Sequence, residues 1–272
     1  MLRLRSALRL SVVWLLGLAA CAPAAPSAGM AVPGPATLTV FAAASLTDAF
    51  TEVGRMFEDA KPGVTVVFNF GASNQLAQQI NEGAPADVFA SANRAQMDVA
   101  IAGGGIVSGT QQTFARNRLL VIFPDDNPGG VETLQGLARP GLKLVLASAE
   151  APVGQYSLDF LDKAAQRADL GPAFKDAVLA NVVSHEENVR AVFTKVALGE
   201  ADAGIVYSSD IVGQSSEDVG RLDIPDDLNT IATYPIAALA GARQAALAQA
   251  FIDQVLSPAG QAVMAKYGFI TV

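Results

Sequence analysis

Residues 37–50 read TLTVFAAASLTDAF and connect an apolar segment to a polar one through a run of small residues. Residues 38–41 are apolar or β-branched, which favours a short strand. Residues 45–59 follow as a helix, and Ser45 with Asp48 three residues later is the pattern of a capping box. The stretch therefore predicts a strand, a short loop and a helix that begins at Ser45.

The same alternation continues to the end of the chain. Further strands are predicted over residues 64–70, 87–90, 118–123, 142–147, 205–207 and 236–240, and further helices over residues 74–82, 156–168, 189–198, 245–256 and 257–267. Strands that alternate with helices predict an α/β fold with largely parallel sheets. The uninterrupted apolar run at 119–123 is typical of a strand that is covered on both faces.

Composition narrows the class of protein. The 272 residues are 51% hydrophobic and 16% charged, with a formal net charge of −8. Such a chain is too apolar to be disordered, and its length suits one large domain or two modest lobes. Without a basic surplus, a nucleic acid is not an expected partner. An acidic net charge also disfavours the binding of an anion.

The first residues have the features of an export signal. Residues 1–20 contain three arginines and then an apolar run that is too short to span a membrane. The tetrapeptide at 18–21, Leu-Ala-Ala-Cys, resembles the lipobox of bacterial lipoproteins, in which cleavage precedes the cysteine and the cysteine is acylated. Lipidation of Cys21 is therefore expected. The alternative is ordinary cleavage further on, near Ala28 or Ala31.

Removal of residues 1–20 changes the net charge and leaves a mature chain with one cysteine. Three arginines and no acids leave with the signal, so the mature net charge is 15 − 26 = −11. Cys21 is the only cysteine, which excludes a disulfide within the mature chain. Residues 22–36 are rich in Pro, Ala and Gly, which is typical of a flexible tether. Residues 21–36 are thus expected to hold the lipid anchor and the tether.

Sequence signatures of catalysis are missing. Neither a G-x-S-x-G elbow nor a G-x-x-x-x-G-K-[ST] loop occurs. His185 is the only histidine, which excludes a zinc site of the His/Cys type and leaves one possible base for a serine nucleophile. The adjacent acid pairs, such as Asp125 with Asp126, are more typical of solvated loops. The sequence therefore predicts that the protein is not an enzyme.

Four loops share a design that suits an anion. Residues 41–47, 70–76, 151–155 and 187–190 each place small, hydroxyl or capping residues before a predicted helix, and Asn188 is a plausible N-cap. The first turn of a helix has unpaired N–H groups and a partial positive charge. Several such turns that converge on one point would form an anion site without Lys or Arg.

Four motifs occur in order: FAAASLT at 41–47, S-x-x-LA-x-QI-x-x-GAPAD at 73–87, GIVY-x-SD at 204–210 and KYGF at 266–269. Together they closely resemble the periplasmic molybdate-binding proteins of ABC importers, the ModA family, over residues 37–272. The resemblance implies the two-lobed Venus flytrap fold of type II periplasmic binding proteins, with the ligand in the cleft between the lobes. It places lobe 1 at residues 37–117 plus 236–272 and lobe 2 at residues 118–235.

The resemblance also implies a set of ligand-binding residues: Ser45, Ser73, Val153, Val189 and Tyr207. The serines would donate through hydroxyl and backbone N–H groups, the valines through backbone N–H groups only, and the tyrosine through its phenol. Molybdenum would enter only as the oxyanion, without direct protein ligands to the metal and without a cofactor. A site made only of donors suits molybdate, which is fully deprotonated at neutral pH; tungstate is nearly the same size, and sulfate is smaller.

The implied function is capture of molybdate, and of tungstate, for delivery to the permease of an ABC importer. The protein is expected to be a monomer in the periplasm or on the cell surface, held at the membrane through Cys21. Three alternatives stay open at this point. They are a receptor for another oxyanion such as sulfate or for a small organic acid, a serine hydrolase that uses Ser45 or Ser73, and the effector domain of a regulator, against which the export signal argues.

Overall fold

The structure is a computed structural model that describes residues 35–212 and 217–272. The predicted signal peptide, Cys21 and all but the last two residues of the predicted tether lie outside the described residues. The last tether residue, Ala36, already belongs to the first strand, so the fold begins one residue earlier than the sequence predicted. No helix in residues 35–212 and 217–272 is long and apolar enough to cross a membrane.

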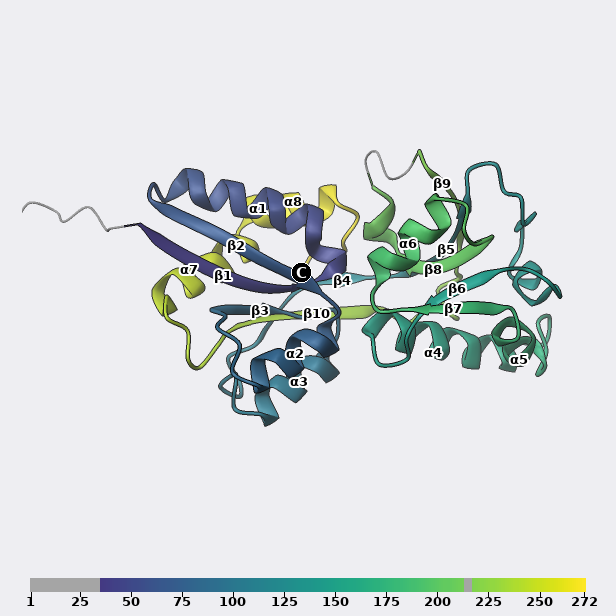
Figure 1. The fold of residues 1–272 in the computed structure, drawn as a ribbon, viewed down its shortest axis with the longest axis horizontal. Helices are drawn as coiled ribbons and strands as arrows, with labels where there is room; N and C mark the ends of the chain where they lie inside the picture. Colours follow the sequence, from purple (N-terminus) through teal and green to yellow (C-terminus); the bar gives the residue numbers. More distant parts are fainter. Residues whose placement is uncertain (1–34, 213–216) are drawn as a thin grey trace, which may run out of the picture. The chain divides into compact units, whose positions relative to one another are not determined.

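The first sheet has five strands in the order β2-β1-β3-β10-β4. They are β1 (Ala36–Ala43), β2 (Val64–Gly71), β3 (Val88–Ala90), β4 (Gln112–Asn117) and β10 (Ala232–Ala238). The helices packed on it are α1 (Thr47–Ala60), α2 (Ser73–Asn81), α3 (Arg94–Ala102), α7 (Ala245–Leu256) and α8 (Pro258–Lys266). Helices α1 and α8 lie on one face, and α2 and α3 lie on the other (Figure 1).

The second sheet also has five strands, in the order β7-β6-β8-β5-β9. They are β5 (Leu119–Pro124), β6 (Leu144–Ala147), β7 (Val182–Glu186), β8 (Ala203–Tyr207) and β9 (Val219–Asp223). Its helices are α4 (Pro152–Gln166), α5 (Phe174–Leu179) and α6 (Val189–Ala197), and the short 3-10 turns of the chain are η1 (Ala44–Leu46), η2 (Leu134–Ala138) and η3 (Ser208–Ile211). Helix α6 covers one face, and α4 and α5 cover the other (Figure 1).

Both sheets are mixed, so the expectation of largely parallel sheets was wrong. Strand β1 runs parallel to β2 and β3, whereas β10 is antiparallel to β3 and β4. Likewise β6 is parallel to β7 and β8, whereas β5 is antiparallel to β8 and β9. The chain passes between the sheets from β4 into β5 and from β9 into β10. These passages contain no crossover helix, so nothing requires the strands they deliver to run parallel to their neighbours.

Helix α1, in the strand–loop–helix unit at the start of the fold, is positioned by the spacing of its large apolar residues. Helix α1 buries Phe50, Val53 and Phe57, which are spaced three and four residues apart and so share one helix face. The Phe50 ring lies 5.5 Å from Phe114 and 5.8 Å from Phe251, centroid to centroid, in the core between the helices and the sheet. The helix ends just before Pro62, as expected of a residue that cannot continue it.

Every strand and helix predicted from the sequence is present; helix α7 matches its predicted range of 245–256, and the other elements have at least one shifted end. The apolar run at 119–123 becomes β5, whose first four residues are buried, as expected for a strand covered on both faces. The structure adds α3, α5, β4, β7 and β9, which the sequence analysis left unassigned. Strand β10 begins at Ala232 rather than at residue 236, and helix α4 begins at Pro152 rather than at residue 156. That earlier start brings Val153 into the first turn.

Candidate functional site

A small cavity gathers the five residues that the resemblance assigned to a ligand: Ser45, Ser73, Val153, Val189 and Tyr207. The first two belong to segments of the first sheet and the other three to segments of the second. The rest of the lining is Ala43, Ala44, Gly71, Ala72, Ala92, Ala151, Pro152 and Asn188. The cavity measures about 20 Å³. A single water needs about 10–15 Å³ by this measure, so the space suits one compact solute rather than a sugar or a peptide.

Ser45 does not have the capping role that the sequence predicted. It lies in η1, and α1 begins two residues later, at Thr47, without a side-chain cap. The Oγ of Ser45 instead shares a hydrogen bond of 2.9 Å with the phenol oxygen of Tyr234 in β10. The capping box was therefore wrong, because a buried tertiary hydrogen bond takes the hydroxyl that a local cap would have used.

Ser73 is the first residue of α2 and is separated from β2 by Ala72 alone. Its side chain is buried, and its Oγ accepts a hydrogen bond of 3.0 Å from the backbone N–H of Ala92. An amide N–H can only donate, so the hydroxyl proton of Ser73 is not used in that bond. The proton remains available to an acceptor in the cavity, as does the Ser73 N–H in the first turn of the helix.

Two valines in the cavity lining lie at helix starts. Val153 is the second residue of α4, after Pro152, and Val189 is the first residue of α6. Asn188 is the N-cap of α6, as predicted, and its side chain accepts a hydrogen bond from the Ala191 N–H at 3.1 Å. The N–H groups of the first turn have no partner within the helix and carry partial positive charge. Both valines thus bring donors without bringing a formal charge.

Tyr207 is the last residue of β8 and is almost fully buried, with 1% of its surface exposed. Among the described residues, its phenol oxygen has no hydrogen-bond partner. Burial raises the pKa of the Tyr207 phenol well above its usual value, so the group is protonated at neutral pH. A buried donor without a partner costs free energy, and an acceptor in the cavity would remove that cost.

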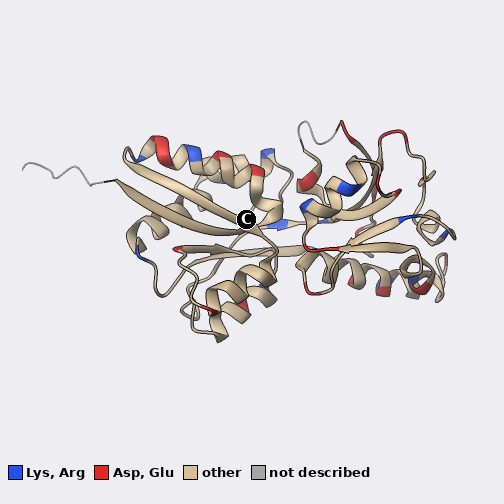
Figure 2. Ribbon diagram, in the orientation of Figure 1, with Lys and Arg blue, Asp and Glu red and all other residues tan. Residues whose placement is uncertain are grey.

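The cavity itself is uncharged, because none of its lining residues is ionised. The guanidinium of Arg190, the residue after Val189, pairs with Asp48 and lies 3.5 Å from Asp210. Burial raises the pKa of Asp210 to about 6 although Arg190 lowers it, and the carboxylate accepts a hydrogen bond of 3.0 Å from the Tyr207 N–H. This cation is therefore balanced by carboxylates. Elsewhere acidic and basic residues are interspersed along the helices and loops (Figure 2).

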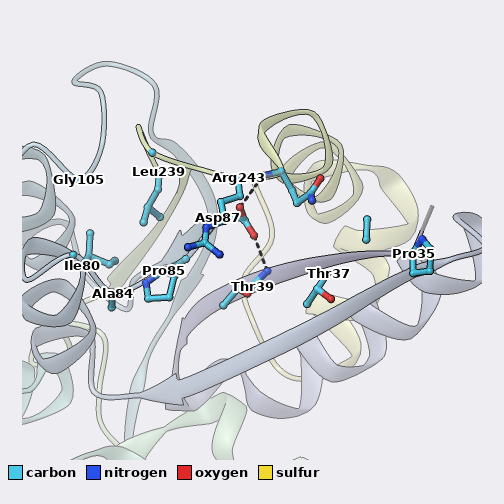
Figure 3. Close-up of a pocket in the computed structure, with 15 residues that line it drawn as sticks. Pro35, Thr37, Thr39, Ile80, Ala84, Pro85, Asp87, Gly105, Leu239 and Arg243 are labelled. Atoms are coloured by element: carbon cyan, nitrogen blue, oxygen red, sulfur yellow. Dashed lines mark hydrogen bonds between the residues drawn. The ribbon is translucent and has the colours of Figure 1, made fainter. Parts of the chain in front are cut away.

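A larger hollow of about 670 Å³ lies elsewhere, beside β1 and the start of α7 (Figure 3). Its buried carboxylate, Asp87, accepts hydrogen bonds of 2.9 Å from the Thr39 N–H and from the Gln244 N–H. The acid thus ties β1 to the segment that leads into α7. None of the five predicted ligand residues lines this hollow.

The structure gives no support to a hydrolase or a metal centre in its described part. His185 is exposed in β7 and does not line the cavity, so neither Ser45 nor Ser73 has a histidine base there. Within residues 35–212 and 217–272, no group of three or more His, Cys, Asp or Glu side chains is arranged to hold a metal ion. Asp125 and Asp126 are exposed, as expected of solvated loop acids.

Sequence reasoning missed Tyr234 and Ala92, the two residues that hydrogen-bond the site hydroxyls. Tyr234 lies 189 residues from Ser45, and Ala92 lies 19 residues from Ser73. Neither belongs to a motif or a helix start. Their roles depend on tertiary contacts, which leave no local signal in one sequence.

Comparison with known proteins gives three findings. The model of the family described as bacterial extracellular solute-binding protein matches residues 38–270. The molybdate-binding protein ModA of Mycobacterium tuberculosis is 36% identical over 261 residues, which are 95% of each chain. Among solved structures, the periplasmic molybdate-binding protein of Azotobacter vinelandii has a TM-score of 0.73 at 21% identity, covering 86% of this chain and 99% of its own.

A protein named for a different ligand has the same fold. The sulfate-binding protein SubI of Mycobacterium tuberculosis superposes with a TM-score of 0.74 at 20% identity, over 87% of each chain. At such identities the likeness shows the fold alone. The fold is thus that of the type II periplasmic binding proteins, as expected, and the likeness of folds leaves the choice of oxyanion open.

Proposed function

The chain belongs to the ModA family of bacterial extracellular solute-binding proteins, and on that premise we propose that it captures molybdate outside the cytoplasm for an ABC importer. Its relatives bind solutes and are not enzymes, and molybdate is cargo for such a protein rather than a cofactor. We propose tungstate as a second ligand because the two oxyanions are nearly the same size.

The observation that supports this proposal is the convergence of uncharged donors on one cavity. We assign two donors, hydroxyl and N–H, to each of Ser45 and Ser73, one N–H to each of Val153 and Val189, and the phenol to Tyr207. A dianion without protons offers only acceptors, so this set matches it. An acidic side chain in the lining would repel it, and the lining has none.

The donors are numerous enough for tight binding. Hydrogen bonds to a charged group contribute roughly 1.5–3 kcal/mol each, and the five residues offer about seven. Micromolar affinity requires about 8 kcal/mol, so a surplus remains after the cost of ordering the ligand. Surface acids more than about 8 Å away are largely screened at physiological ionic strength. The net charge of −11 expected after removal of residues 1–20 therefore bears on the rate of anion encounter at low salt more than on the site.

We propose that capture proceeds by closure of two lobes, residues 37–117 plus 236–272 and residues 118–235. A ligand that is held from both lobes favours the closed arrangement by its differential affinity for it. The hydrogen bond between Arg190 and Asp48 joins the same two parts of the chain beside the cavity. We propose that the closed protein, as a monomer, then docks on the permease.

A comparison of oxyanions tests the proposed ligand. Molybdate at one hundred times its Kd should stabilise the mature protein by about 2.7 kcal/mol and raise its melting temperature, and sulfate at the same concentration should not. Isothermal calorimetry with molybdate, tungstate and sulfate gives the affinities directly. The only tryptophan, Trp14, leaves with the signal peptide, so intrinsic tryptophan fluorescence cannot report binding. Equal shifts of the melting temperature with molybdate and sulfate would contradict the proposal and indicate a general oxyanion receptor.

We also propose that Cys21 anchors the protein in the membrane, at the cell surface or in the periplasm. Several acyl chains anchor stably where one is marginal, and a tether would keep the binding domain close to its permease. Cys21→Ser should move the protein from the membrane fraction to the soluble fraction, measured by immunoblot after ultracentrifugation. A Cys21→Ser protein that still sediments with membranes would exclude this anchor.

A further inference from the structure

A chain of buried hydrogen bonds leads away from the cavity through Ser45. The Oγ of Ser45 lies 2.9 Å from the phenol oxygen of Tyr234, and the Nδ2 of Asn117 lies 3.4 Å from that same phenol oxygen. All three side chains are buried, Tyr234 and Asn117 completely. Since either hydroxyl could donate in the first bond, the direction of the chain has to be worked out from its far end.

The orientation of the Asn117 amide is fixed by a group that can only donate. Its Oδ1 accepts hydrogen bonds from the backbone N–H of Arg118 at 3.0 Å and from the Ser208 hydroxyl at 2.9 Å. A flipped amide would set NH2 against N–H, which is unfavourable. The Nδ2 therefore faces Tyr234 and the Ser209 hydroxyl, and it can only donate to them.

The direction at Tyr234 follows from this. Its oxygen accepts from Asn117, so the phenol proton needs an acceptor, and the Ser45 oxygen is the hydrogen-bonded group that can accept it. The opposite direction would leave the phenol proton of a fully buried residue without a partner, at a cost comparable to a lost hydrogen bond. Tyr234 thus donates to Ser45, and the Ser45 proton is left for the cavity.

We propose that Tyr234 is a positioning residue of the oxyanion site, which turns the Ser45 hydroxyl into a donor toward the ligand. The inference rests on the proposed function and deepens it. Burial raises the pKa of the Tyr234 phenol, which keeps its proton available at neutral pH. The Ser73 hydroxyl is also left as a donor toward the cavity, because its oxygen already accepts a hydrogen bond from the Ala92 N–H. Both serine hydroxyls then meet the ligand with their protons, as a fully deprotonated oxyanion requires.

A double-mutant cycle on molybdate binding tests this role, with Tyr234→Phe, Ser45→Ala and the combination measured by calorimetry. Tyr234→Phe keeps the ring packed against Phe114 and Phe269. It should weaken molybdate binding at least about fivefold in the native background and less than about twofold in the Ser45→Ala background. Tyr267→Phe is the matched control, because it removes a phenol hydrogen bond to Glu52 away from the cavity and should not change the affinity.

Whether Tyr234→Phe weakens or tightens binding, and whether its effect adds to that of Ser45→Ala, decides between a positioning role and a structural one. Tighter binding by Tyr234→Phe would mean that Ser45 had been donating to Tyr234, and the proposal would be overturned. An equal loss in both backgrounds, or a loss that only follows a lowered melting temperature of the free protein, would show a merely structural tyrosine. If the native protein binds sulfate and not molybdate, the proposed function fails, and the same cycle with sulfate still tests Tyr234. A native protein that binds none of these oxyanions removes both proposals.

Discussion

Replacing Ser73 by alanine is expected to weaken molybdate binding by about tenfold to a hundredfold, at 1.5–3 kcal/mol for a hydrogen bond to a charged group. The substitution removes the hydroxyl, whose proton is free to donate to an acceptor in the cavity. It also leaves the buried N–H of Ala92 without its acceptor. The backbone N–H of residue 73 remains, so the loss of affinity reports on the hydroxyl, through its contact with the ligand and its bond with the Ala92 N–H. Calorimetry with molybdate measures the change, and the melting temperature of the free protein shows whether the fold is kept.

Two control variants separate the ligand contact from general effects. Ser91 is a fully buried serine whose hydroxyl donates to the backbone oxygen of Asn93, and it does not line the cavity. Ser91→Ala should therefore lower stability without a comparable loss of affinity. His185→Ala should be nearly neutral for both. A large effect of His185→Ala would revive the hydrolase hypothesis, and an unchanged affinity of Ser73→Ala would remove Ser73 from the site.

The parts of the fold with strong local patterns could be predicted from the sequence. Helix α1 has regularly spaced large apolar residues and a proline at its end, and β5 is an uninterrupted apolar run. The elements left unassigned have weaker patterns. Helix α3 buries only Met97 and Ala100, and β9 (Val219–Asp223) includes a glycine and an arginine. Tertiary packing decides such segments, and one sequence does not display it.

The same holds for the site: its residues could be predicted, whereas the geometry that orients them could not. The small and hydroxyl residues before helices are local features, and the resemblance could point to them as a set. The hydrogen bond between Ser45 and Tyr234 could not be predicted, and a local capping rule led to a wrong role for Ser45. The strand directions were also beyond local reasoning, since β5 and β10 take theirs from the passages of the chain between the sheets.

Gly154→Ala is expected to weaken ligand binding indirectly, by displacing the first turn of α4. Gly154 follows Val153, and a Cβ built on it would lie 1.9 Å from the backbone oxygen of Ser148 and 2.7 Å from that of Ala147. Both are backbone atoms at the end of β6, which cannot move aside as a flexible side chain could. The helix start must therefore shift away from the sheet, and the Val153 N–H shifts with it.

We expect Gly154→Ala to lower the free energy of unfolding by about 1–3 kcal/mol, as overpacking of a tight site does, and to raise the Kd for molybdate at least tenfold. Urea denaturation and calorimetry measure the two quantities. Gly241→Ala is the matched control, because a Cβ there meets no atom within 4 Å and it should change neither. If Gly154→Ala binds molybdate as the native protein does, the position of the α4 start is not what limits binding. The Val153 N–H would then lose its assigned role, and the donors of Ser45, Ser73, Val189 and Tyr207 would have to account for the affinity.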